Sequence, residues 1–169
     1  MQLEHHNISF KEHEHSIILL CDSVNSPANM GSLFRIADSF GVEKLVFGAV
    51  DVDLKSPRLK RTARATQNWM PMEDNVNLAE YISVLKTKGY LPVALEITKN
   101  SQPIDSAAFP KKEKIALVIG DENTGISEAV LSQCEQQVHI TMFGKNSSMN
   151  VSQATAIALY ELTKQLQQH

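Results

Sequence analysis

The fold class is decided by the stretch Leu117-Val118-Ile119-Gly120-Asp121-Glu122-Asn123-Thr124-Gly125-Ile126-Ser127. It begins as an apolar strand and opens into an acidic loop with a glycine at each end. Residues 138–152 repeat the arrangement of apolar run, glycine and polar cluster before a helical stretch. In open α/β sheets, loops at the carboxyl ends of parallel strands bind ligands. The alternation of short apolar runs with amphipathic stretches predicts an α/β fold with a mainly parallel sheet flanked by helices.

Hydrophobic periodicity predicts the other strands and helices of the chain. Strands are predicted at 17–21, 44–47, 91–95, 115–119 and 138–141, and helices at 30–40, 78–86, 127–133 and 150–167. Residues 51–75 show no clear period and are expected to form a loop with a helical turn. The helix at 150–167 starts with Asn150 and Gln153, which resemble a capping box.

Composition restricts the class of protein. With 169 residues, 43% hydrophobic and 21% charged, the chain fits one globular domain, predicted to span 16–169 after a polar segment at 1–15. No apolar run approaches the roughly 20 residues of a membrane span and no signal-peptide layout is present, so a cytoplasmic location is expected. The net charge of −3 argues against coating nucleic acid by bulk charge, but leaves room for a local basic patch.

Cysteines and histidines give no sign of a metal site or of a disulfide framework. Cys21 and Cys134 lack metal-ligand spacing and are expected to be ordinary reduced thiols. The N-terminal histidines do not form a defined tetrahedral set, and no metal is expected. They are His5, His6, His13 and His15.

Common nucleotide-binding and hydrolase signatures are absent. The chain has no GxGxxG after the first strand, no GxxxxGK[ST] and no GxSxG. Three strand-to-loop junctions remain, and each has a purely structural interpretation: Asn29, Ser127 and Asn150 as helix caps, with Arg35 as a solvated surface residue. Their joint occurrence in this order is what points to a function.

Three motifs in fixed order resemble those of the SpoU, or TrmH-like, RNA ribose methyltransferases of the SPOUT superfamily. They are Asn29-Met30-Gly31 with Arg35, then 120–125 (GDENTG), then 148–152 (SMNVS, where SLN is the more usual form). The resemblance spans roughly residues 17–162. It implies a C-terminal deep trefoil knot, a rare exception among folds. It also implies a homodimer and S-adenosylmethionine as methyl donor, with S-adenosylhomocysteine as product.

By matching motif positions, the resemblance also implies roles for individual residues. Asn29 and Arg35 would reach the target nucleotide, Glu122 would organise the site, and Ser148 and Asn150 would orient substrate or Arg35. Because a guanidinium ordinarily stays protonated, Arg35 is expected to bind phosphate and stabilise the developing alkoxide rather than act as the base.

The donor pocket implied by the resemblance lies at the ends of three strands. The matching positions are Leu95, Gly120, Ile140, Ser148 and Met149. Backbone groups would pair with adenine while the apolar side chains enclose its ring. Simple core packing is the alternative interpretation of these apolar residues.

A window from residue 54 to residue 72 contains basic residues and no Asp or Glu. Phosphate attraction would explain this concentration, with Trp69 available for base stacking. A solvated basic loop is the alternative. The basic residues expected to contact RNA are Arg35, Lys55, Arg58, Lys60, Arg61 and Arg64.

Together these observations predict an S-adenosylmethionine-dependent RNA ribose 2′-O-methyltransferase that acts on transfer RNA, with ribosomal RNA as the alternative substrate. Two other classes compete. A non-catalytic RNA-binding relative would have been free to lose several of the motif residues. A base-nitrogen methyltransferase is disfavoured by Arg35 and by the 148–150 motif.

Overall fold

Parallel strands form the centre of the protein. The computed structural model describes residues 16–111, 113–146 and 148–167, so the predicted polar segment 1–15 and its histidines lie outside the described residues. The sheet has seven strands in the order β3-β2-β1-β6-β4-β7-β5, and every paired strand is parallel to its neighbour. The strands are β1 (Ser16–Asp22), β2 (Lys44–Gly48), β3 (Met72–Val76), β4 (Tyr90–Leu95), β5 (Gln102–Pro103), β6 (Lys114–Gly120) and β7 (Gln136–His139).

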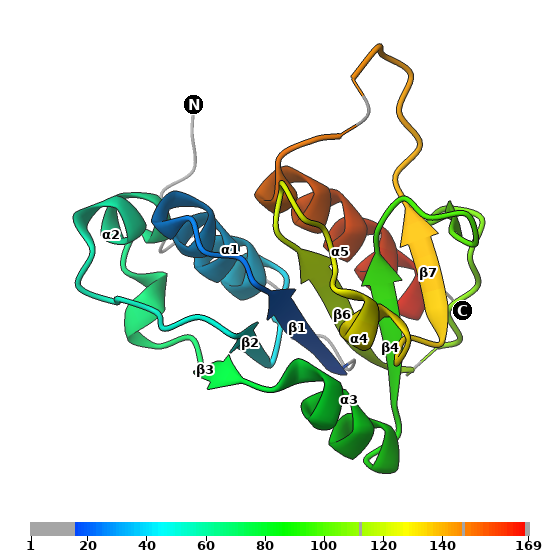
Figure 1. Cartoon of the computed structure of the whole chain (residues 1–169), viewed down its shortest axis with the longest axis horizontal. Helices are drawn as coiled ribbons and strands as arrows, with labels where there is room; N and C mark the ends of the chain where they lie inside the picture. The colour runs from blue at the N-terminus through cyan, green and yellow to red at the C-terminus, as the bar shows by residue number, and fades with distance from the viewer. Residues whose placement is uncertain (1–15, 112, 147, 168–169) are drawn as a thin grey trace.

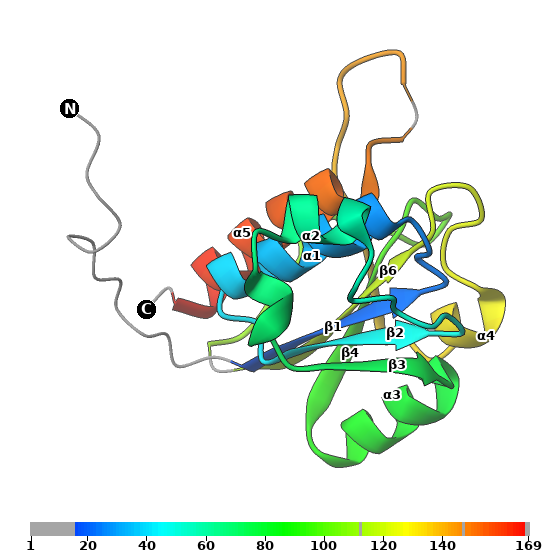
Figure 2. The same cartoon turned by 90° about the vertical axis from the view of Figure 1, so that its left-hand side faces the viewer.

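Helices cover both faces of the sheet. On one face lie α1 (Pro27–Ser39), α2 (Pro57–Ala63) and α5 (Val151–Gln167), and on the other lie α3 (Leu78–Thr87) and α4 (Glu128–Leu131) (Figures 1 and 2). A short 3-10 helix, η2 (Thr66–Asn68), follows α2. The predicted α/β fold with a parallel sheet flanked by helices is confirmed.

Alternating side chains along the central strands divide the core in two. In β1, Ile17 and Leu19 join the cluster under α1 and α5, whereas Ile18 and Leu20 join the cluster under α3. Successive side chains of a strand point to opposite faces, so a strand covered on both faces is apolar throughout. This is why residues 17–21 and 115–119 read as uninterrupted apolar runs.

The structure corrects four of the expected elements. Residues 51–75 contain α2, η2 and the strand β3, not only a loop with a helical turn. The strand expected at 138–141 ends at His139 and begins at Gln136, and the helix expected at 127–133 is the four-residue α4. Helix α1 begins at Pro27 because the Ser26 side chain accepts the Asn29 N–H, so Ser26, and not Asn29, is its cap.

Helices α1 and α2 approach each other closely at Gly31. A Cβ atom there would lie 2.1 Å from the Thr62 hydroxyl oxygen and 2.3 Å from the Leu59 carbonyl oxygen. The Thr62 hydroxyl in turn donates to the Ala28 carbonyl at 2.9 Å, which joins the two helices. The contact depends on the absence of a side chain at position 31.

We therefore expect Gly31→Ala to destabilise the fold despite alanine's higher helix propensity. Overpacking of this kind costs about 1–3 kcal/mol, which lowers the melting temperature by several degrees in a domain of this size. Gly144→Ala is the matched control, because a Cβ there has no atom within 4 Å. Thermal unfolding followed by circular dichroism makes the measurement, and equal melting temperatures for the two variants would contradict the account.

Candidate functional site

The Glu122 carboxylate joins the three sequence motifs. Its Oε1 accepts a hydrogen bond from Asn29 Nδ2 at 3.1 Å and one from Asn150 Nδ2 at 2.5 Å. Asn150 Nδ2 also lies 3.0 Å from Asn29 Oδ1, and the Val151 backbone N–H points at Glu122 Oε1 at 3.3 Å. Asn29 is in the first turn of α1, Glu122 follows β6, and Asn150 precedes α5. Segments more than ninety residues apart thus meet at one carboxylate.

Local structure explains why Asn150 can take part. Its side-chain oxygen accepts the backbone N–H groups of Ser152 at 3.0 Å and Gln153 at 3.4 Å, so Asn150 caps α5 as predicted. With the oxygen used in the cap, the amide nitrogen turns toward Glu122. The carboxylate also lies at the N-terminus of α5, where a negative charge is favoured by the helix dipole.

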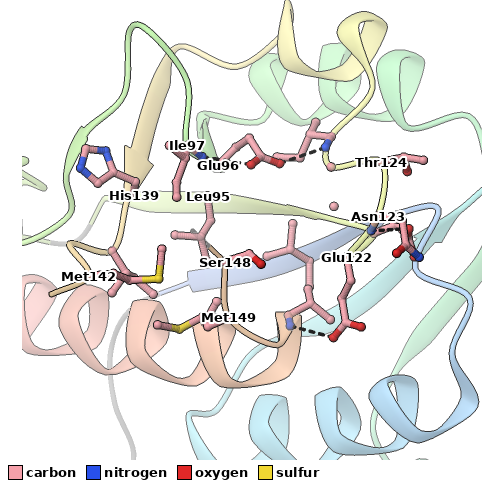
Figure 3. Close-up of a pocket in the computed structure, with 18 residues that line it drawn as sticks. Leu95, Glu96, Ile97, Glu122, Asn123, Thr124, His139, Met142, Ser148 and Met149 are labelled. Atoms are coloured by element: carbon pink, nitrogen blue, oxygen red, sulfur yellow. Dashed lines mark hydrogen bonds between the residues drawn. The ribbon is translucent and has the colours of Figure 1, made fainter. Parts of the chain in front are cut away.

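A cavity of about 480 Å³ opens beside this junction, at the carboxyl ends of β4, β6 and β7 (Figure 3). All five residues predicted for the donor pocket line it, namely Leu95, Gly120, Ile140, Ser148 and Met149. Glu122 lines it as well. The mixture of apolar side chains, backbone and a few polar groups is typical of a small-molecule site.

The loop between β6 and α4 needs both of its glycines. A Cβ at Gly120 would lie 2.2 Å from the Gly125 carbonyl carbon, and Gly125 has a φ of +67°. The Gly125 N–H donates to the Asp121 carbonyl at 2.9 Å, which closes the loop on itself. The close approach and the left-handed backbone both favour glycine over any residue with a side chain.

Two further carboxylates anchor the same loop. Asp22, buried at the end of β1, accepts the Ser127 N–H at 2.7 Å. Glu96, the residue after β4, accepts the N–H groups of Ile126 at 3.2 Å and Ile97 at 3.0 Å. Sequence analysis missed both residues. Their position in the sequence could have indicated them, because each is an acidic residue at the carboxyl end of a predicted strand.

Arg35 is exposed on the outward side of α1 and does not line the cavity of about 480 Å³. It borders a second concavity, of about 540 Å³, between α1, α2 and α5, together with Arg61 and Arg64. We call this concavity, with Arg35, Arg61 and Arg64, the arginine groove. Lys55, Arg58 and Lys60 are exposed in and just before α2. The structure therefore brings Asn29, Glu122 and Asn150 into contact with one another. Within a single chain, Arg35 lies outside the cavity.

The segment between β7 and α5 projects from the body of the protein, as the orange loop in Figures 1 and 2. Phe143 on this loop is 96% exposed. Ser148 and Met149 at its far end turn back toward the cavity, opposite Leu95 (Figure 3). One wall of the cavity is thus formed by the end of a largely exposed loop.

Neither cysteine is suited to nucleophilic chemistry. Both are free, and burial raises the pKa of Cys134 to about 12 and that of Cys21 further still. No group of three or more His, Cys, Asp or Glu side chains that could hold a metal occurs within residues 16–111, 113–146 and 148–167. In that same part of the chain, no helix is both long and apolar enough to cross a membrane.

Comparison with known proteins gives consistent matches. Residues 16–160 match the model of the SpoU rRNA Methylase family. A Saccharomyces cerevisiae tRNA (guanosine(18)-2′-O)-methyltransferase is 36% identical over 154 residues, which cover 88% of this chain and 10% of the yeast protein. The Bacillus subtilis 23S rRNA (guanosine(2553)-2′-O)-methyltransferase RlmP is 30% identical over 145 residues, or 86% of this chain and 57% of that protein.

A solved structure matches as well. It is that of the SpoU methyltransferase AviRb from Streptomyces viridochromogenes in complex with the cofactor AdoMet, with a TM-score of 0.78 and 26% identity. The match covers 92% of this chain and 59% of AviRb. The chain therefore spans little more than half the length of AviRb and RlmP, and a tenth of the yeast protein.

We expect Glu122→Ala to loosen the junction of the three motifs. Three donors lose their acceptor, and because the carboxylate is partly exposed we expect a loss of about 1 kcal/mol, or a few degrees in melting temperature. Glu80→Ala on α3 is the control, as an exposed glutamate on the other face of the sheet. A Glu122→Ala melting curve identical to that of Glu80→Ala would contradict this role.

Proposed function

Because the chain belongs to the SpoU rRNA methylase family, we propose that it transfers a methyl group from S-adenosylmethionine to a ribose 2′-hydroxyl of RNA. The observation that carries the proposal is the meeting of Asn29, Glu122 and Asn150 at the mouth of the cavity. The three motifs that sequence analysis matched separately converge on one place. A protein that only bound RNA would not need this junction beside a small-molecule cavity.

The cavity suits the donor in its chemistry. Leu95, Ile140 and Met149 offer apolar surface for an adenine ring, and the backbone from Gly120 onward offers polar groups at its edge. Ser148 and Glu122 border the same space. When bound, the donor supplies a methyl group already activated by its sulfonium, so the protein need only align the acceptor and manage one proton.

In the mechanism we propose, this chain's polar residues position the ribose. Glu122 and Asn150 hold the Asn29 side chain in place, and the Asn29 amide together with the Ser148 hydroxyl orients the target nucleotide. Arg35 binds phosphate and stabilises the negative charge that develops on the 2′-oxygen as its proton leaves. With the donor bound, transfer would form the oxygen–methyl bond, break the carbon–sulfur bond of the donor and release the 2′-hydroxyl proton to water.

A homodimer is supported by the outward surface of α1 and α5. Ile157 and Tyr160 on α5 are 44% and 63% exposed, and Ile36 and Phe40 on α1 are partly exposed. Ile36 and Phe40 also line one side of the arginine groove, to which Arg35 contributes and which does not share a lining residue with the cavity. Pairing of two chains here would bring Arg35 of one toward the cavity of the other.

A C-terminal trefoil knot is also part of the proposal. Strand β7 pairs with β4 on the side away from β6, yet α5 packs against α1 over the middle of the sheet. Between them the chain must cross back past the 120–126 loop, where Val151 meets Glu122. This return path supports the predicted knot, which we place in the single domain predicted at 16–169.

Transfer RNA is the proposed substrate, because the yeast relative with 36% identity is named a tRNA methyltransferase. Ribosomal RNA is the second candidate, supported by the name of the Bacillus subtilis relative. A cytoplasmic location stays a prediction.

The test is incubation with radiolabelled S-adenosylmethionine and bulk tRNA or rRNA, then nuclease digestion and nucleoside mapping. We expect label in 2′-O-methylnucleosides, lost in Asn29→Ala and Arg35→Ala. Label confined to methylated bases would contradict the proposed reaction. Donor binding without transfer to either RNA class would contradict the proposed substrates.

Arg35→Lys tests the need for a guanidinium. Lysine keeps the charge but loses the planar fork that grips phosphate with two hydrogen bonds, so we expect turnover to fall by at least about tenfold. Lys88→Arg, at the exposed C-cap of α3, is the matched control and should stay at the level of the unmodified chain. Turnover of Arg35→Lys near that level, with unchanged RNA affinity, would show that a point charge suffices.

Tyr160→Glu tests the proposed dimer surface. A charge in the centre of an apolar contact is strongly unfavourable, so we expect the variant to sediment as a monomer at concentrations where the unmodified chain sediments as a dimer. Val84→Glu introduces the same charge on α3, where the side chain is 50% exposed, and should leave the dimer intact. Identical sedimentation of both variants would argue against this surface.

A further inference from the structure

Trp69 is the chain's single tryptophan, and it is 59% exposed. Tryptophan side chains are highly buried on average in folded proteins. When a tryptophan side chain is exposed, the fold loses the stabilising free energy that burial of its apolar surface would give. The roles proposed above for the cavity and the dimer surface do not use this side chain.

Two hydrogen bonds hold Trp69 in place, one from its ring and one from its backbone. The indole Nε1–H donates to Asp38 Oδ1 on α1 at 2.8 Å, and the Trp69 backbone N–H donates to the Thr66 carbonyl at 3.2 Å. The next residue, Met70, is buried. The side chain is thus oriented from its backbone and from its polar edge while more than half of its surface stays open.

The turn that brings Trp69 to α1 also places arginines near it. Arg64 and Ala65 both have left-handed backbone, with φ of +53° and +75°, and they reverse the chain between α2 and η2. On α1, Arg35 lies one turn before Asp38, so the two side chains share the exposed side of the helix. Trp69 is therefore beside the arginine groove.

The charge of this surface favours an anion. The described residues that line the arginine groove include Arg35, Arg61 and Arg64 and no acidic side chain. A polyanion with flat apolar parts fits both features, and single-stranded RNA is such a partner, because its bases stack on aromatic rings while its phosphates contact cations.

We propose that Trp69 is a stacking platform for an unpaired RNA base, with the flanking phosphates held in the arginine groove. This inference rests on the proposed function, since it requires RNA as the partner. It adds a contact outside the donor cavity and names the structural state of the RNA at that contact. Because every base has a flat face, the contact would tolerate different sequences but not a paired base.

The single tryptophan makes a direct experiment possible, because all tryptophan fluorescence comes from this ring. We would titrate the unmodified chain with single-stranded oligoadenylate and with the same strand paired to its complement. We expect saturable quenching by the single strand, with a midpoint equal to the dissociation constant from filter binding, and much weaker quenching by the duplex. Binding of the single strand with unchanged emission would overturn the inference.

Variants separate stacking from charge. We expect Trp69→Ala to weaken oligoadenylate binding by about 5- to 150-fold, Trp69→Phe to restore most of it, and neither to change the salt dependence of binding. Arg61→Ala should instead reduce that dependence by about one phosphate contact. Val84→Ala, an exposed apolar side chain on the other face of the sheet, is the control. Unchanged affinity in Trp69→Ala would overturn the inference.

Three other outcomes distinguish this inference from the proposed function. Emission that changes with protein concentration and not with RNA would assign the ring to a contact between copies of the chain, which overturns the stacking role. Methyl transfer to RNA that is equally efficient in Trp69→Ala would overturn the stacking role while leaving the proposed function in place. Failure of both transfer and RNA binding in the unmodified chain would overturn both.

Discussion

The hydrogen bonds around Glu122 hold together segments that the chain keeps far apart. One oxygen accepts Asn29 from α1, Asn150 from the start of α5, and the Val151 N–H. An amide that both donates to a carboxylate and caps a helix can do so in few geometries, so the junction sets where α1 and α5 begin relative to the end of β6. The position of the cavity follows from this, because its walls are the loops that lead into these elements.

At the carboxyl edge of the sheet, three carboxylates accept hydrogen bonds from backbone N–H groups. Asp22, Glu96 and Glu122 follow or end three different strands, and each accepts a backbone N–H from another segment, namely that of Ser127, Ile126 and Val151, respectively. Buried backbone donors must find acceptors, and a carboxylate at a strand end supplies one without competing with the sheet. The glycines at 120 and 125 let the central loop pass close enough for this to work.

Much of the fold was predictable because burial on both faces leaves an unmistakable sequence pattern. Strands β1, β2, β4 and β6 and helices α3 and α5 lie where the pattern placed them, and α1 begins three residues earlier than predicted. Strand β3 was missed because its sequence, MEDNV, is at the sheet edge and mostly exposed, and α2 was missed because only Leu59 and Ala63 of its seven residues are buried. The motif residues were found, but their hydrogen bonds were not, since which oxygen of Glu122 meets which amide depends on the tertiary fold. Arg35 was predicted to lie at the site because it belongs to the first motif. Within one chain it lies outside the cavity, so its position relative to the site could not be predicted from the sequence of the motif.

The proposed reaction requires that the methyl donor occupy the cavity between the carboxylate-anchored loops. Amide hydrogen exchange with and without S-adenosylmethionine tests this most directly. Donor binding should slow exchange in the 120–127 loop and at Met149 to Val151, and leave α3, on the other face of the sheet, unchanged. Saturating donor that protects neither segment, or that protects the arginine groove instead, would contradict the placement of the site.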